Sequence, residues 1–181
     1  MPSKPFKLRR WQLRHDDQPI YFYTAARPGR SSDPTSRHAH VPDSVVSRWI
    51  LSLPGPRTAI ISLLGAKPDG MSEYSFYTFS GGSDSSTDKH RSFEAWLRDR
   101  HPEQEIELVE RPTIDFQAVP KETIVKVLED IRRLVAQGKT VVLVDSGGET
   151  RTGAVCRGIG ATEAFSCMPT TFPCASGGLI G

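Results

Sequence analysis

The residues from 140 to 153, TVVLVDSGGETRTG, combine the parts of an anion-binding loop. An apolar run ends at Asp145, a pair of glycines follows, and Arg151 stands just before a predicted helix start at Thr152. A glycine-rich turn into a helix points several backbone N–H groups at one spot, and the helix dipole favours an anion there. The planar guanidinium of Arg151 could clamp two phosphate oxygens. An ordinary strand-to-helix turn with a surface arginine is the alternative.

Four residues of this stretch match a known signature position for position: Gly148, Arg151, Thr152 and Gly153. The signature, H-C-x-x-G-x-x-R-S/T-G between a strand and a helix, is that of the cysteine-dependent protein tyrosine phosphatase superfamily. The sequence resembles its small dual-specificity branch most, over residues 19–153. The resemblance implies a phosphorylated protein or a small phosphate monoester as ligand and no cofactor. It also implies a set of phosphate-binding residues: Ser146, Gly147, Gly148, Glu149, Thr150, Arg151 and Thr152.

The sequence departs from this signature at the nucleophile. The cysteine of the family falls on Asp145, and the preceding histidine falls on Val144. A carboxylate can accept a phosphoryl group in other enzymes, so one hypothesis is a phosphomonoester hydrolase in which Asp145 or water attacks phosphorus. The other is a pseudophosphatase, which binds phosphorylated ligands without turnover. Asp145 could also fold inward onto Arg151 as an ion pair and close the pocket.

A second candidate catalytic residue, Asp115, precedes the longest predicted helix. The family places a general-acid aspartate on a loop before such a helix, so the resemblance implies that Asp115 protonates the leaving oxygen, with Asp145 and Arg151 as its catalytic partners. A carboxylate that only caps a turn is the alternative. Cys156 lies five residues beyond Arg151, and we expect it to pack in the core rather than replace the missing nucleophile.

Other site types find less support. The segment 145–148 resembles the serine-protease sequence G-D-S-G-G, but Val144 replaces its first glycine and an amphipathic helix precedes it. No G-K-S/T follows the glycines, which excludes a Walker loop. A haloacid-dehalogenase site needs a second aspartate where Gly147 stands. His38 and His40 lack partners at metal-ligand spacing, so we expect no metal.

The elements around this loop alternate between strands and helices. Residues 121–137 carry apolar side chains with offsets of 3, 4, 7, 10 and 11, which predicts an amphipathic helix ended by Gly138. The alternation predicts an α/β fold with a mainly parallel central sheet flanked by helices, residues 140–144 being its central strand. The other predicted strands are 19–24, 58–64, 72–79 and 105–109, and the other helices span 43–53 and a short segment after Ser92.

Composition limits the remaining possibilities. The 181 residues fit one domain, and 23 Lys+Arg against 21 Asp+Glu give a net charge of +2. This balance offers no case for a polyanion held by bulk charge, and we do not expect a nucleic-acid partner. The longest apolar runs are far shorter than the ~20 residues of a membrane span. Three cysteines without a close pair, and no secretory signal, lead us to expect a cytoplasmic protein without disulfides or membrane contact.

We predict three segments along the chain. Residues 1–18 are basic and are expected to form a solvated tail with Trp11 packed on the domain. The phosphatase-like domain spans 19–157, with a polar insertion loop at 80–90. Glycines and prolines interrupt residues 158–181, so we expect at most a short helix after Thr152 and then an irregular tail. On this interpretation the fold is truncated on that side or completed by another chain, and the oligomeric state is left open.

Overall fold

A computed structural model describes residues 5–15, 17–28, 43–65, 93–162 and 168–170. The predicted strand at 72–79, the insertion loop at 80–90, Ser92, His38 and His40 lie outside these residues. No helix in the described part of the chain is long and apolar enough to cross a membrane.

A six-stranded sheet forms the middle of the molecule, in the order β4-β3-β5-β2-β1-β6. Its four parallel strands are β2 (Gln18–Ala26), β3 (Arg57–Ser62), β4 (Glu105–Glu110) and β5 (Thr140–Asp145). Two antiparallel strands, β1 (Arg9–His15) and β6 (Met168–Thr170), extend the sheet at one edge. The predicted α/β class with a mainly parallel sheet is confirmed, and β5 takes the central place expected for it.

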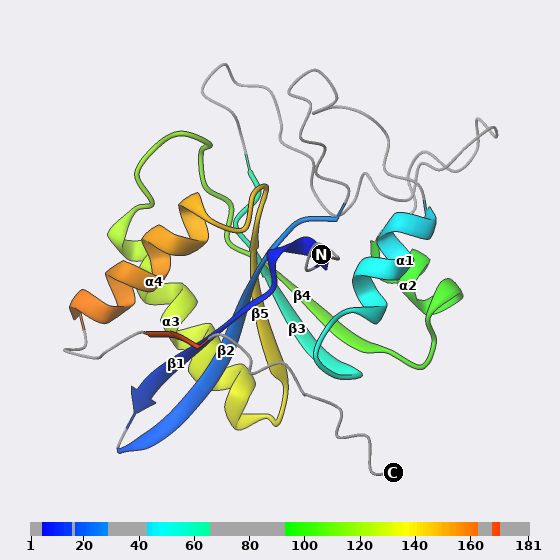
Figure 1. The fold of residues 1–181 in the computed structure, drawn as a ribbon, viewed down its shortest axis with the longest axis horizontal. Helices are drawn as coiled ribbons and strands as arrows, with labels where there is room; N and C mark the ends of the chain where they lie inside the picture. The colour runs from blue at the N-terminus through cyan, green and yellow to red at the C-terminus, as the bar shows by residue number, and fades with distance from the viewer. Residues whose placement is uncertain (1–4, 16, 29–42, 66–92, 163–167, 171–181) are drawn as a thin grey trace, which may run out of the picture.

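Helices cover both faces of this sheet (Figure 1). On one face lie α1 (Asp43–Leu51) and α2 (Phe93–Arg100), which pack Trp49, Ile50 and Trp96 against β3 and β5. On the other lie α3 (Lys121–Ala136) and α4 (Thr150–Thr162). The predicted apolar face of α3 is confirmed, since Val127, Leu128, Ile131 and Leu134 are all buried.

The N-terminal segment is part of the sheet rather than a tail. A short 3-10 turn, η1 (Pro5–Lys7), leads into β1, which pairs with β2 along its whole length. Leu13 is fully buried, and Trp11 donates its indole N–H to the Thr24 hydroxyl at 2.9 Å. The expectation of a solvated tail is wrong for these residues, because alternate side chains of a basic strand can face the core while its arginines face solvent.

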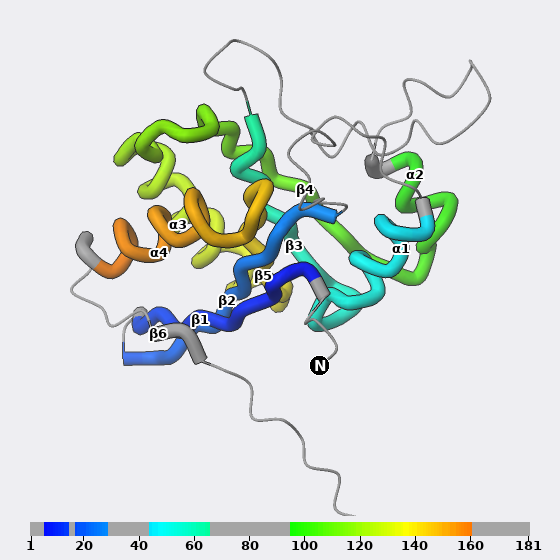
Figure 2. The backbone as a smooth tube through the Cα atoms, turned by 45° about the horizontal axis from the view of Figure 1, so that its top comes forward, coloured from blue at the N-terminus to red at the C-terminus, as the bar shows by residue number. Residues whose placement is uncertain are grey.

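The prediction of at most a short helix after Thr152 is also wrong. Helix α4 has 13 residues and continues through Gly153 and Gly158. A Cβ atom at Gly158 would lie 2.6 Å from Cδ1 of Ile124 on α3. This glycine therefore allows α4 to pack closely on α3, which compensates for its low helix propensity. Figure 2 shows α3 and α4 side by side.

Candidate active-site loop

The loop 146–149 begins where β5 ends, between the ends of its two neighbouring strands. The backbone N–H of Arg27 donates to the carbonyl oxygen of Asp145 at 2.9 Å, and that of Leu63 to the carbonyl of Val144 at 2.8 Å. These bonds continue the β2–β5 and β3–β5 pairings by one residue. Ligands bind at this carboxyl edge of a parallel sheet. The loop therefore lies between a central strand and a helix, as predicted from the sequence.

Glycine is required at position 148 by both conformation and space. Gly148 has a φ of +70°, in the left-handed region that other residues rarely adopt. A Cβ atom there would lie 2.4 Å from the backbone nitrogen of Ala26. The loop therefore rests directly on the end of β2, and its curvature follows from this contact.

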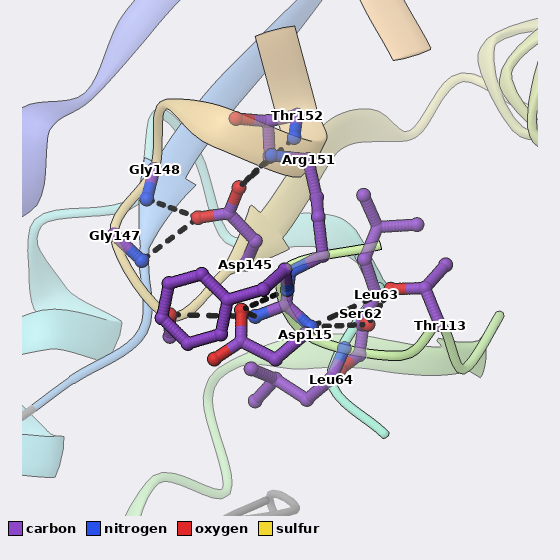
Figure 3. Close-up of polar contacts among 12 residues, drawn as sticks. Ser62, Leu63, Leu64, Thr113, Asp115, Asp145, Gly147, Gly148, Arg151 and Thr152 are labelled. Atoms are coloured by element: carbon purple, nitrogen blue, oxygen red, sulfur yellow. Dashed lines mark hydrogen bonds and ion pairs between the residues drawn. The ribbon is translucent and has the colours of Figure 1, made fainter. Parts of the chain in front are cut away.

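The carboxylate of Asp145 lies inside this loop, and the residue is 1% exposed. One oxygen, Oδ1, accepts hydrogen bonds from the backbone N–H groups of Gly147, at 2.8 Å, and Gly148. The other, Oδ2, accepts from the N–H groups of Arg151 and Thr152, each at 2.9 Å. Figure 3 shows the carboxylate between these donors.

The loop is thus an anion cradle, and the anion in it belongs to the chain. Two of the four donors, Arg151 and Thr152, stand in the first turn of α4, where N–H groups have no partner within the helix. The positive end of the helix dipole adds to the attraction. The inward fold considered from the sequence does occur, but backbone N–H groups hold the carboxylate instead of the Arg151 guanidinium.

The side chain of Arg151 extends toward β3 and the loop that follows β4. Its Nη1 donates to the carbonyl oxygen of Leu63 at 3.3 Å and to the Thr113 hydroxyl at 3.5 Å. Its Nη2 donates to the Ser146 hydroxyl at 3.3 Å and lies 3.4 Å from Oδ1 of Asp115. The side chain is 3% exposed, so these groups hold it almost completely out of solvent.

Thr113 anchors the loop that carries Asp115. Its N–H and its hydroxyl both donate to the carbonyl of Leu63, at 3.2 and 2.7 Å. Gly65 allows this close approach, because a Cβ atom there would lie 2.4 Å from the Thr113 carbonyl oxygen. The structure therefore brings Asp115, Arg151 and Asp145 together, as the sequence resemblance implies. The side chain of Asp115 is 18% exposed.

Glu149 and Thr150 face away from the cradle and are exposed. The Glu149 carboxylate pairs with Lys7 at 3.0 Å and with Arg9 at 3.1 Å, both of them about half exposed. Exposed pairs of this kind add little stability, but they place the N-terminal residues beside the loop. Of the seven residues predicted to bind phosphate, these two have side chains in surface ion pairs or solvent.

Sequence reasoning missed several groups of this site. The Leu63 carbonyl has no sequence signal, because any residue supplies a carbonyl and only the fold places it. Gly65 and Thr113 follow an apolar run and a proline, which are weak signals of a turn. Lys7, at the end of η1, and Arg9, at the start of β1, belong to the N-terminal segment that was interpreted as a tail.

Two further expectations concern Cys156 and metals. Cys156 is buried on α4 among the core residues that include Val155 and Ile159, so its expected packing role is confirmed. Within the described ranges, no three His, Cys, Asp or Glu side chains gather in a way that could hold a metal ion.

Comparisons with known proteins add only a distant similarity in structure. No family model matches the sequence, and no curated protein matches it. A crystal structure of Tk-PTP in a glycine-to-alanine mutant form matches with a TM-score of 0.45 and 14% identity, over 84% of this chain and 73% of that chain. Tk-PTP in its active form matches with a TM-score of 0.44 and 16% identity, over 80% and 71%.

Proposed function

We propose that this chain is a phosphatase-like domain without phosphoryl-transfer activity, a pseudophosphatase. One observation carries the proposal: the Asp145 carboxylate accepts hydrogen bonds from four backbone N–H groups of the loop that would hold a phosphate. The sequence signature around Arg151 and the position of Asp115 support the phosphatase-like part of the proposal.

A phosphate group and the Asp145 carboxylate compete for the same donors. Each carboxylate oxygen already accepts two N–H bonds, so little remains of its capacity to act as a nucleophile. Phosphate entering beside it would place a second negative charge next to a buried carboxylate. A ligand can use the cradle only after the carboxylate leaves it, and that step breaks four hydrogen bonds.

The other two candidate catalytic residues, Asp115 and Arg151, are bound to each other. Asp115 lies 3.4 Å from the Arg151 guanidinium and pairs with it. A general acid must instead lie within hydrogen-bond reach of the leaving oxygen. Arg151 and Asp115 therefore satisfy each other in the present arrangement, rather than a phosphoryl group and its leaving oxygen.

The sequence predicts a phosphorylated ligand, and the occupied cradle lets us state how strongly such a ligand should bind. We propose that phosphate monoesters bind this loop weakly in the parent protein, because they must displace an internal carboxylate. The recognition of a partner protein would rest on the surface around the loop, with the cradle serving as a structural anchor.

An assay with a generic aryl phosphate tests the loss of activity. We expect no turnover above the buffer rate by the purified parent chain. The matched variants are Arg151→Ala, within the site, and Arg98→Ala, which removes an exposed arginine of α2. Turnover that disappears in Arg151→Ala and persists in Arg98→Ala would support the alternative hydrolase, with Asp145 or water as nucleophile and Asp115 as acid.

A further inference from the structure

The β1–β2 hairpin presents a polar face on the same side of the sheet as α1 and α2. The register pairs Arg10 with Tyr23, Gln12 with Tyr21 and Arg14 with Pro19, and directly paired residues point to one side of a sheet. Trp11, Leu13 and Phe22 point to the other side, into the core beneath α3 and α4. We call Arg10, Gln12, Arg14 and Tyr21 the hairpin face.

This face lies beyond the helices that cover the rest of the sheet on that side. In Figure 2, α1 and α2 lie over β3 and β4, and the β1–β2 hairpin extends away from them. Tyr21 is 42% exposed and Arg14 is exposed, although both belong to paired strands. Arg10 and Gln12 are half-buried, so solvent reaches the hairpin face mainly at Arg14 and Tyr21.

The positive charge of the hairpin lies on its strands, and two acidic residues, Asp16 and Asp17, stand between these strands in the sequence. The strand sequences RRWQLRH and QPIYFYTAA contain three arginines and no acidic residue. Arg10 and Arg14 share the hairpin face, so this face is positive although the net charge of the full chain is only +2. That overall charge led us not to expect a nucleic-acid partner, and the hairpin face is the local exception.

Spacing along β1 suits a ligand with repeated negative charges. Arg10 and Arg14 share one face four residues apart, a separation of about 13 Å along a strand. Two guanidinium groups based so far apart are poorly placed to clamp a single phosphate. Between them stands an aromatic ring, since the guanidinium of Arg10 lies 5.2 Å from the centre of the Tyr21 ring.

We propose that the hairpin face binds single-stranded nucleic acid. Arg10 and Arg14 would contact separate phosphates of one strand, and a base would replace the Arg10 guanidinium over the Tyr21 ring. Aromatic rings beside cations on an open sheet form the kind of platform on which unpaired bases stack. A duplex hides the faces of its bases, and a phosphopeptide offers one phosphate, so both fit this face less well. The proposal does not depend on the state of the Asp145 loop.

Fluorescence anisotropy with a labelled oligouridylate of about 15 nucleotides, at low salt, tests this proposal. We expect Tyr21→Ala to weaken binding by roughly 5-fold or more, since stacking contributes about 1–3 kcal/mol per base. Tyr21→Phe keeps the ring and should bind like the parent. The double variant Arg10→Ala/Arg14→Ala should also weaken binding and reduce the slope of log K against log salt by about 1.4, the value for two phosphate contacts on a single strand.

The control variant Arg98→Ala/Arg100→Ala removes the same charge from the exposed end of α2. It should leave both affinity and salt slope close to those of the parent. Arg14→Ala alone, at an exposed position, serves as the test if the double hairpin variant melts early. Absence of binding would overturn the proposal, as would an equal loss in the α2 control. Competition by a duplex or a phosphotyrosine peptide as effective as that by the single strand would also overturn it.

Discussion

At the scale of single residues, position 145 determines what the loop can do. An aspartate places its oxygens one bond farther from the backbone than a thiol places its sulfur, and these oxygens reach all four N–H donors of the cradle. The neighbouring Thr152 hydroxyl is buried and has no hydrogen-bond partner among the residues that the structure describes. The four N–H donors of the loop thus all donate to the carboxylate of its own Asp145.

The substitution Asp145→Asn should destabilise the protein more than its small size suggests. An amide keeps one acceptor oxygen, but its NH₂ group must face two N–H donors. A buried donor left without a partner costs roughly 1–3 kcal/mol, so we expect a loss of at least ~2 kcal/mol in the free energy of unfolding. Urea denaturation measures this loss. Glu105→Gln, at an exposed ion pair, is the control and should change stability by less than ~0.5 kcal/mol.

The substitution Asp145→Cys should give the loop some phosphatase activity. The shorter side chain frees the cradle for phosphate, and the N–H donors and helix end should lower the pKa of the introduced thiol from its usual ~8.5. The Thr152 hydroxyl, which is buried and has no partner within the described ranges, could donate to the resulting thiolate. We expect aryl-phosphate turnover well above that of the parent, with Val144 in place of histidine limiting the gain.

Adding Asp115→Asn to Asp145→Cys provides the control for this gain. The second change removes the group that would protonate the leaving oxygen, so turnover should fall again. A folded Asp145→Cys protein with an ordinary thiol pKa and no turnover would show that the loop is not a phosphate cradle.

At the scale of elements, the packing of α4 on α3 explains why the C-terminal part of the domain was underestimated. Glycines at 153, 158 and 160 lower the intrinsic helix propensity, and propensity was the only guide that the sequence offered. Tertiary contact outweighs it here, because Gly158 lets the two helices approach closely. The apolar side chains of α3 recur so regularly that the sequence alone predicted this helix and its buried face.

The substitution Gly158→Val should therefore cost stability despite valine's better helix propensity. Its side chain would overlap Ile124, and overpacking of this kind costs about 1–3 kcal/mol. Combining it with Ile124→Ala should recover part of the loss in a double-mutant cycle. Gly153→Ala is the contrast. Its Cβ would meet only the Arg157 guanidinium at 3.4 Å, so thermal denaturation should show an unchanged or slightly raised Tm.

At the scale of the whole molecule, sequence reasoning succeeded where the signal is local and failed where it depends on distant partners. The apolar run of β5 and the order of strands and helices indicated the parallel part of the sheet. Strands β1 and β6 meet across more than 150 residues of sequence, and no local pattern marks that pairing. The site residues Asp115, Arg151 and Asp145 were placed in one site by resemblance, but which atoms hold the Asp145 carboxylate depends on the fold.

The central claim is that the Asp145 carboxylate occupies the anion site of this loop. Calorimetric titration of inorganic phosphate into the parent and into Asp145→Ala tests it most directly, with Asp145→Ala/Arg151→Ala as the control. We predict no measurable binding by the parent at millimolar phosphate, binding by Asp145→Ala, and a weaker affinity in the control. Tight, Arg151-dependent binding of phosphate by the parent would contradict the claim, and so would an Asp145→Ala variant that folds and binds no phosphate.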